Sequence, residues 1–465
     1  MSLEDKFYPF LALYDRFPDA VKWGLGFSFR QLPQSIRRGN HYARFRALAE
    51  ESEHWDENRI AEYQLKQLRW TLQIANTHCP YYQRRFANSG FNPDKLQSPE
   101  DLKHAPLLEK IDLIEHREDM VSRAMPPTKR LYLTTGGTTG EPVGFYLEKG
   151  IGRAKEHAFM ETMWKRGGYF DGARMAMLRG HVTSTKADGK ISSYDATRDW
   201  LVLSSYHMTL ERLPIYLEKL ERFKPDLLYT FASTALQLAE YMEASGLKWR
   251  LPLRGILCSS ERLTTPQQRM IEGVFKTKCY TWYGHTERVV MAAWGRSSQL
   301  YYFHPLYGFA EFGPPDSEGL REVIGTTFDN IAMPLIRYRT GDYVRLLEDR
   351  SIKMEYPWIA ATEIAGREQE FVYSGTGRKI SLATFNMHDD IFDDLYSVQF
   401  YQDRPGKIHL RYIAGPRFTP ARLPKIESGL KRKLGDDFEL VLENVQEVEK
   451  TARGKHKWLV SKINN

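Results

Sequence analysis

The 465-residue chain has no hydrophobic run as long as a membrane-spanning helix needs, which is about 20 apolar residues. Its first residues, Met1 to Lys6, are of mixed charge and lack the basic start and apolar core of a signal peptide. The three cysteines, Cys79, Cys258 and Cys279, are too few and too scattered for a disulfide framework or a four-ligand zinc site. These absences predict a cytoplasmic protein without stable membrane insertion.

The sequence also lacks a concentrated basic block. The formal net charge of +7 is the difference between 66 Lys/Arg and 59 Asp/Glu, and the excess is spread along the chain. Nucleic-acid binders more often concentrate their positive charge in a stripe or patch. We therefore expect no nucleic-acid partner, and an excess this diffuse is compatible with small anionic substrates or with an ordinary solvated surface.

The order of the expected strands and helices predicts an α/β fold. Between Arg174 and Tyr283, strand-like and helix-like segments alternate, which is typical of a parallel sheet covered by helices. Beyond Leu300, short strands with Gly and Pro turns predict a β-rich subregion. A smaller α+β unit follows. We predict a large N-terminal domain over residues 1–365 and a small mobile domain over 366–465, with a hinge at 366–369.

The N-terminal segment is expected to be helical. Residues 53–77 have apolar side chains at helical spacing and predict one long helix. Residues 7–46 predict shorter helices wrapped over the main body. Residues 21–29 could contact a membrane or a partner, but packing on the main domain is the favoured reading, because Lys22 and Arg30 are the only cations there.

The stretch Thr134 to Pro142 reads Thr-Thr-Gly-Gly-Thr-Thr-Gly-Glu-Pro. Glycine permits positive φ, and threonine hydroxyls can donate to an anion, so this loop suits a polyphosphate. It lies between two expected strands and lacks the Gly-Lys-Ser/Thr of nucleoside triphosphatases. By itself, a loop of this composition is more often a flexible surface turn.

Two further segments carry carboxylates next to turns. The segment Tyr283-Gly-His-Thr-Glu287 offers oxygen ligands for a hard cation such as Mg²⁺, and its glycine would let a ligand approach the backbone. The segment Tyr338-Arg-Thr-Gly-Asp342 ends in a carboxylate that could accept hydrogen bonds from two ribose hydroxyls. A surface turn explains either segment when it is taken alone.

Two segments near the end of the chain carry cations. The pair Gly366-Arg367 provides a fixed fork of hydrogen-bond donors. The segment Lys450-Thr-Ala-Arg-Gly-Lys455 places a lysine behind a flexible glycine. Taken singly, it reads as a solvated basic turn.

Together, the five segments occur in an order that resembles the adenylate-forming superfamily, which includes acyl- and aryl-CoA ligases. The resemblance spans Leu131 to Lys455. Within the superfamily the chain looks closest to the phenylacetate-CoA ligases and their CapK-like relatives from capsular polysaccharide loci. The segments that suggest this are 203–207, 258–265 and 303–311.

The resemblance implies a role for each segment. Lys455 would reach the carboxylate and the α-phosphate as the catalytic cation, and Glu287, next to Thr286, would hold the Mg²⁺ that accompanies ATP. Asp342 would bind the ribose, with Arg367 beside it. The remaining ATP-binding residues would be Thr135, Gly136, Gly137, Thr138, Thr139, Gly140, Tyr283 and Gly284.

The chain departs from the family pattern at two places. Val143 and Gly144 stand where many members carry a lysine after the phosphate loop, which would leave loop closure with less help from a cation. Gln369 stands where the hinge usually has an acid or a lysine, which leaves open how the small domain rotates between the two half-reactions.

The acyl site is expected near Phe231, Ser259 and Trp282, with His207 and His285 as further candidates. The aromatic side chains could stack on an aryl acid, although core packing is the more common role for such residues. A single histidine is likewise more often hydrogen-bonded in a core than bound to substrate.

The resemblance implies ATP-dependent activation of an aryl or acyl carboxylic acid to an acyl-adenylate, with release of pyrophosphate and transfer to an acceptor. Coenzyme A is the favoured acceptor. An amine or hydroxyl acceptor in polysaccharide or natural-product assembly stays open, as does a nucleotide-binding protein without turnover. The expected partners are small molecules, and the chain is expected to be a monomer or a homodimer.

Overall fold

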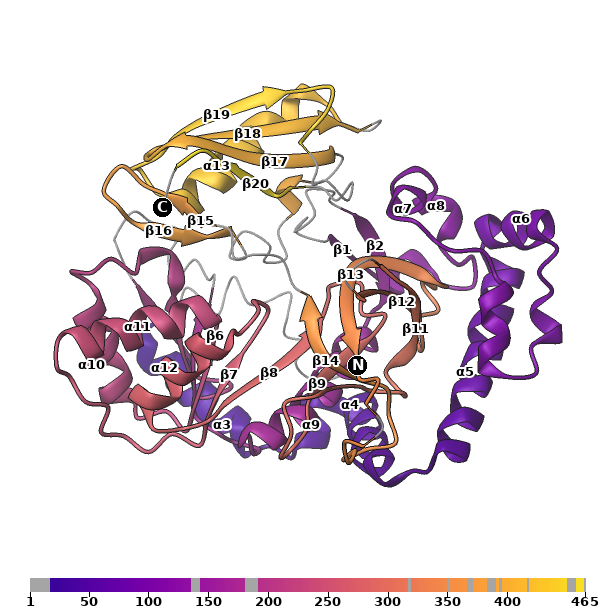
Figure 1. Cartoon of the computed structure of the whole chain (residues 1–465), viewed down its shortest axis with the longest axis horizontal. Helices are drawn as coiled ribbons and strands as arrows, with labels where there is room; N and C mark the ends of the chain where they lie inside the picture. Colours follow the sequence, from indigo (N-terminus) through magenta and orange to yellow (C-terminus); the bar gives the residue numbers. More distant parts are fainter. Residues whose placement is uncertain are drawn as a thin grey trace.

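The computed structural model describes residues 17–134, 143–179, 191–316, 319–349, 351–365, 371–382, 390–392, 395–415, 418–449 and 457–463. Figure 1 shows a large part made of helices and a long sheet, and a smaller part above it that holds the C-terminal strands. The α/β class predicted from the sequence is confirmed.

Within the described residues, twelve strands form one mixed sheet in the order β11-β12-β13-β14-β10-β9-β8-β7-β6-β3-β5-β4. Their bounds are β3 (Met175–Arg179), β4 (Ser192–Asp195), β5 (Trp200–Ser204), β6 (Leu227–Thr230), β7 (Gly255–Cys258), β8 (Cys279–Gly284), β9 (Met291–Trp294), β10 (Tyr301–Phe303), β11 (Gly308–Pro315), β12 (Arg321–Thr327), β13 (Tyr338–Leu346) and β14 (Ala360–Ala365). Strands β5, β3, β6, β7 and β8 run parallel, and the pairs from β8 to β12 along this order are antiparallel. The β-rich subregion predicted beyond Leu300 therefore continues the parallel sheet.

Helices connect the parallel strands, as the alternating pattern predicts. They are α10 (Leu213–Phe223), α11 (Ala232–Ala244) and α12 (Thr265–Phe275). Helix α12 begins at a capping box, in which Thr264 and Gln267 satisfy each other's backbone amides. Strand β7 is buried at every residue, which is why its sequence is a continuous apolar run.

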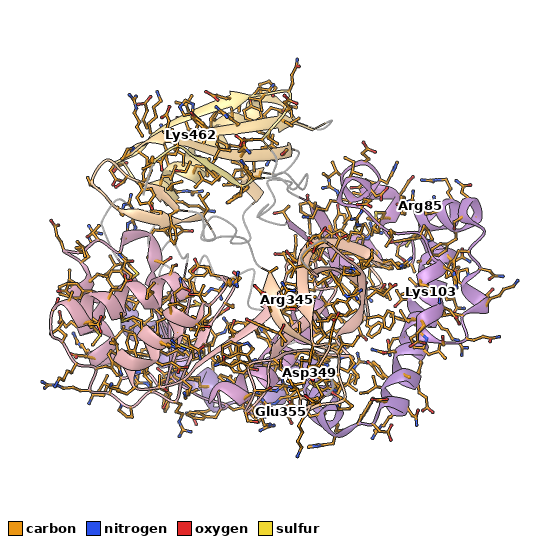
Figure 2. All side chains as sticks on the ribbon, in the orientation of Figure 1. Arg85, Lys103, Arg345, Asp349, Glu355 and Lys462 are labelled. Carbon is orange, nitrogen blue, oxygen red and sulfur yellow. The ribbon has the colours of Figure 1, made fainter. Side chains whose placement is uncertain are left out.

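The N-terminal helices are α3 (Asp19–Gln31), α4 (Gln34–Glu51), α5 (Glu57–His78) and α6 (Pro80–Ser89), followed by the short α7 (Lys110–Glu115) and α8 (Arg117–Met120). Helix α5 confirms the long helix predicted over residues 53–77. It lies at the right of Figure 1 together with α6, and Figure 2 labels Arg85 in α6 and Lys103 on this side of the molecule, apart from Lys462 on the C-terminal part.

Helix α3 packs on the main body through one narrow face. A side chain at Gly26 would collide with the Ala196 carbonyl at 2.4 Å, and Arg30 donates to that carbonyl at 2.8 Å. The apolar side chains Val21, Trp23, Leu25 and Phe27 are 44, 55, 50 and 45% exposed. The expected packing of residues 21–29 thus occurs at Gly26 and through Arg30, and these four apolar side chains stay about half exposed.

Helix α9 (Gly152–Trp164) lies against α4, and their contact contains a polar core. The buried Glu161 accepts hydrogen bonds from Tyr42 at 2.7 Å and from Arg38 at 2.5 Å. Burial and this carboxylate together hold the Tyr42 pKa above its usual value. The N-terminal helices are therefore fixed to the main body behind β8.

Strands β1 (Arg130–Thr134) and β2 (Gly144–Glu148) form the antiparallel pair predicted on either side of the Thr/Gly loop, with Thr134 opposite Gly144. The loop itself, residues 135–142, lies outside the described residues. The structure therefore confirms the two flanking strands.

The C-terminal part, as far as it is described, contains a four-stranded sheet in the order β19-β18-β17-β20 with one helix. The bounds are β15 (Phe371–Tyr373), β16 (Lys379–Ser381), β17 (Leu395–Arg404), β18 (Lys407–Ala414), α13 (Leu423–Leu434), β19 (Glu439–Asn444) and β20 (Leu459–Ser461). The sheet and α13 share their own hydrophobic core. The predicted hinge at 366–369 lies outside the described residues, so the boundary at 365 stays a prediction.

None of the helices described is both long and apolar enough to cross a membrane.

Candidate active site

The acyl-site candidates lie side by side at one edge of the parallel sheet. In register, Leu178 pairs with Thr230, Thr230 with Cys258, and Cys258 with Thr281. The residues that follow these four in the chain are Arg179, Phe231, Ser259 and Trp282. Because the carboxyl ends of parallel strands meet at one edge of a sheet, three residues predicted from separate segments come together there.

Aromatic side chains surround this edge. The Trp282 ring lies 5.2 Å from that of Trp164 and 5.6 Å from that of Tyr229, between ring centroids. Phe231 is fully buried at the start of α11. Aromatic packing of this kind builds a core and can equally form the wall of a site for an apolar acid.

Tyr283 and Asp342 form the first polar pair of the candidate site. Tyr283 is near the end of β8, and its hydroxyl donates to Asp342 Oδ2 at 2.8 Å. Burial and the adjacent carboxylate raise the pKa of Tyr283 well above its usual value. The tyrosine is therefore a neutral donor that orients Asp342 while leaving its negative charge in place.

A bulge in β13 aims Asp342. The pairing of β12 with β13 shifts between Glu322 and Ile324, and Gly341 opposite them has a φ of 71°. Glycine adopts this left-handed conformation without steric cost. The buried Thr340 accepts from the Asp342 amide at 3.1 Å and donates to the Val323 carbonyl at 2.7 Å, which fixes the turn.

Glu287 and Tyr338 form a second pair of the same kind. Glu287 is buried, and its Oε1 accepts from the Tyr338 hydroxyl at 2.8 Å. No cluster of three or more His, Cys, Asp or Glu side chains in the described part of the chain could hold a metal. One carboxylate fits Mg²⁺ that arrives with ATP, because this ion takes its other ligands from phosphates and water.

The backbone between these pairs leaves room for a ligand. A Cβ placed on Gly284 would meet no atom within 4 Å, as expected if a ligand approaches the chain there. The ring of His285 stacks on that of Tyr283, with centroids 5.7 Å apart. Both ring nitrogens of His285 are buried without a hydrogen-bond partner among the described residues, and Thr286 follows it directly.

His207 lies apart from this cluster, near the C-terminal part. Burial and the nearby Arg378 lower its pKa below the usual value. Arg378 belongs to the C-terminal part and donates to the carbonyl of Tyr206, the residue before His207, at 2.6 Å. The histidine thus faces the contact between the two parts of the molecule.

The other predicted site residues lie outside the described residues. They are Thr135, Gly136, Gly137, Thr138, Thr139, Gly140, Arg367 and Lys455.

Sequence reasoning missed two residues at the site. Tyr338 is the first residue of the segment that predicted Asp342, but its hydroxyl donates a hydrogen bond to Glu287. No local sequence pattern reveals this pairing. Arg179 ends a buried strand, and a cation directly after an apolar run was a signal that could have been used.

The chain is similar to two kinds of known protein. Protein CapK of Staphylococcus aureus is 22% identical over 369 residues, which cover 78% of this chain and 81% of CapK. The phenylacetate-coenzyme A ligase of Pseudomonas putida is 28% identical over 315 residues, which cover 65% of this chain and 70% of that enzyme. No family model matches the sequence.

Solved structures agree in fold. A 2-hydroxyisobutyryl-CoA ligase in complex with 2-HIB-AMP and CoA superposes with a TM-score of 0.54 at 18% identity, covering 89% of this chain and 91% of that one. The same ligase with R3-HIB-AMP gives 0.51, covering 85% and 88%. The chain therefore has the adenylate-forming ligase fold and is related in sequence to the phenylacetate-coenzyme A ligases and to CapK, as the order of its five segments implies.

Proposed function

We propose that the protein uses ATP to convert a carboxylic acid into an acyl-adenylate and then transfers the acyl group to coenzyme A. The relationship to phenylacetate-coenzyme A ligases supports the reaction class. The observation that carries the proposal is the pair of carboxylates near the end of β8, each held by a tyrosine hydroxyl: Asp342 by Tyr283 and Glu287 by Tyr338. They stand next to the row of strand ends expected to hold the acid.

In the first half-reaction, a carboxylate oxygen of the substrate attacks the α-phosphorus of ATP. A new P–O bond forms, and the bond to pyrophosphate breaks and leaves its electron pair on pyrophosphate. Two anions must approach each other, so stabilisation of negative charge dominates the barrier. Lys455, as the resemblance implies, would supply one positive charge, and Mg²⁺ held through Glu287 would, when bound, supply more.

The two tyrosines prepare these carboxylates for their roles. The donation from Tyr283 occupies Oδ2 of Asp342, so Oδ1 stays available to accept from a ribose hydroxyl. The donation from Tyr338 occupies Oε1 of Glu287, so Oε2 can face a cation. The donation from Tyr283 does not neutralise Asp342, because burial and this carboxylate raise the pKa of Tyr283 well above its usual value.

In the second half-reaction, the thiolate of coenzyme A attacks the acyl carbonyl and AMP leaves with the electron pair of the C–O bond. A different acceptor is the second candidate, because the CapK match covers more of this chain than the phenylacetate-coenzyme A ligase match, 78% against 65%. In that case an amine or a hydroxyl would replace the thiol.

The test is release of pyrophosphate from ATP and Mg²⁺ with a panel of aryl, fatty, amino and sugar acids, first without an acceptor. We expect release with one class of acid, and its loss in Glu287→Gln. Coenzyme A, amines and sugars are then added in turn to identify the acceptor. Bound ATP without pyrophosphate release for any acid would contradict the proposal and favour a nucleotide-binding protein without turnover.

A further inference from the structure

Arg179 is a buried cation at the acyl edge of the sheet. It ends β3 and is 7% exposed. Its Nη1 donates to Ser259 Oγ at 3.0 Å, and its Nη2 lies 3.5 Å from Ser260 Oγ. The guanidinium carbon lies 4.5 Å from the ring centroid of Tyr229 and 4.7 Å from that of Phe231.

Within the described residues, Arg179 forms no ion pair. Among the described residues, the partners of the Arg179 guanidinium are two hydroxyls and two aromatic rings, and Nε has no hydrogen-bond partner at all. A guanidinium carries five N–H donors, and two of them meet the serines. The edge formed by Nε and the adjacent Nη nitrogen is the edge that binds a carboxylate through two parallel hydrogen bonds.

Arg166 shows what a structural arginine looks like in this protein. Its side chain is fully buried and also lies against two rings, at 4.5 Å from Tyr356 and 5.5 Å from Trp358. Unlike Arg179, it donates to a buried carboxylate, with Nη2 2.8 Å and Nε 3.1 Å from Glu53 Oε1. A buried charge normally needs such a partner, because its removal from water is costly. Arg179 has the rings without the carboxylate.

We propose that Arg179 binds a second anionic group on the carboxylic acid substrate and so selects acids that carry one. This inference rests on the proposed function. The missing partner of Arg179 would then arrive with the ligand, and Ser259, already expected at the acyl site, would hold the guanidinium in place.

The position of β3 sets the shape of the acid. In the sheet, β3 is separated from β8 by β6 and β7, and three steps of about 4.8 Å place the two strands roughly 14 Å apart. The carboxylate pairs expected to bind nucleotide and Mg²⁺ lie at the β8 end. The second anionic group must therefore be several bonds from the reacting carboxylate, and the rings of Tyr229 and Phe231 favour an apolar or aromatic body near it.

The test compares matched acids that differ by one carboxylate: phenylacetate with 1,4-phenylenediacetate, and hexanoate with adipate. For the native protein we expect kcat/KM for pyrophosphate release to be higher with the diacid of each pair. In Arg179→Met this value should fall about 10- to 100-fold for the diacids, as for the loss of a charged hydrogen-bonded pair. It should fall less for the monoacids, so that the ratio of kcat/KM between diacid and monoacid drops, and KM for ATP should not rise in proportion.

Two other kinetic outcomes would overturn the inference. If the native protein prefers the monoacids and Arg179→Met keeps that preference, the arginine does not bind a second anionic group of the acid. If the variant raises KM for ATP equally with every acid, Arg179 binds a phosphate of the nucleotide. Arg179→Lys keeps the charge but loses the two-pronged geometry, so it should recover part of the diacid activity.

A binding measurement separates this inference from the proposed function. If no acid releases pyrophosphate from the native protein, the proposed function fails, and thermal shifts with adipate and 1,4-phenylenediacetate still decide the role of Arg179. A diacid should raise the melting temperature of the native protein and not that of Arg179→Met. No shift in either protein overturns the inference.

The melting temperature without ligand distinguishes a ligand-binding arginine from a purely structural one. Arg179→Met removes an unpaired buried charge, so its melting temperature should equal or exceed that of the native protein. Arg166→Met, the matched control, leaves the Glu53 carboxylate without its buried partner and should melt lower. A similar loss of stability in both variants would contradict the inference.

Discussion

The carboxyl ends of β3, β6, β7 and β8 form a row along one edge of the sheet. Within the described residues, charged side chains without an ion-pair partner lie at both ends of this row, and their charges have opposite signs. At β8, Asp342 and Glu287 are held by tyrosine hydroxyls, and in the described part of the chain no lysine or arginine pairs with either carboxylate. At β3, Arg179 is held by serine hydroxyls, and in the described part of the chain no carboxylate forms an ion pair with it. Among the described residues, no ion pair is formed by the two carboxylates at one end or by the guanidinium at the other.

Elsewhere the protein pairs its buried charges. Lys155, buried in α9, lies 3.0 Å from Asp329, and Arg337 lies 3.0 Å from Glu311. Neutral hydroxyl donors and acceptors fix the direction of a charged group without cancelling its charge, so the group stays ready for a charged ligand. The comparison supports the two proposals, that cations and ribose bind at the β8 end and that an anion binds at the β3 end.

The largest expected effect comes from Lys455, which lies outside the described residues. If this lysine contacts the carboxylate of the acid and the α-phosphate, as the resemblance implies, it acts mainly in the transition state. We expect Lys455→Ala to lower the rate of pyrophosphate release by about 10²- to 10³-fold while ATP binding is kept. Loss of ATP binding in a folded variant, seen by calorimetry, would mean that the lysine holds the ground state instead.

A smaller effect is expected at the β8 end for Asp342→Asn. The amide keeps the shape of the side chain but accepts hydrogen bonds from ribose less strongly, because it carries no charge. KM for ATP should rise about 10- to 100-fold with little change in kcat. Glu363→Gln is the control, since this carboxylate in β14 is paired with Arg262 at 2.6 Å. Equal changes in both variants would remove the distinction between unpaired and paired carboxylates.

Much of the fold could be predicted from the sequence, because its signals are local. The long helix predicted over residues 53–77 is present as α5, Glu57–His78, because its apolar residues recur at helical spacing. The union of the parallel strands with the β-rich strands in one sheet was not foreseen. It depends on the antiparallel pairing of β8 with β9, which joins the parallel strands to the antiparallel ones. The sequence of neither strand shows which strand will be its partner.

The candidate site could be predicted in part. Turn residues and family order predict Asp342 and Glu287, and Phe231, Ser259 and Trp282 are predicted because each follows or ends an apolar strand. Their partners could not be found in this way. The bonds from Tyr283 to Asp342 and from Tyr338 to Glu287 cross 59 and 51 residues of chain, so they exist only once the sheet has formed.

The smallest expected effect tests whether the tyrosine at the β8 end only orients its carboxylate. Tyr283→Phe should raise KM for ATP about 3- to 10-fold, the cost of one hydrogen bond. Since burial and Asp342 raise the Tyr283 pKa well above 10, the hydroxyl stays protonated and the ratio of native to variant KM should be constant from pH 7 to about pH 9.5.

Tyr194→Phe is the matched control for this change, because Tyr194 also donates to an aspartate, Asp199 Oδ1 at 2.8 Å, but at the far edge of the sheet. It should leave KM for ATP unchanged. The hydrogen bond of Tyr283 also stabilises the fold below pH 10, and that contribution is lost only as the pH rises through the raised pKa. A KM ratio that falls toward one between pH 7 and pH 9.5 would show that Tyr283 ionises there. Asp342 would then lose its hydrogen-bond donor. The comparison with Arg179, which is held by neutral hydroxyls, would no longer hold.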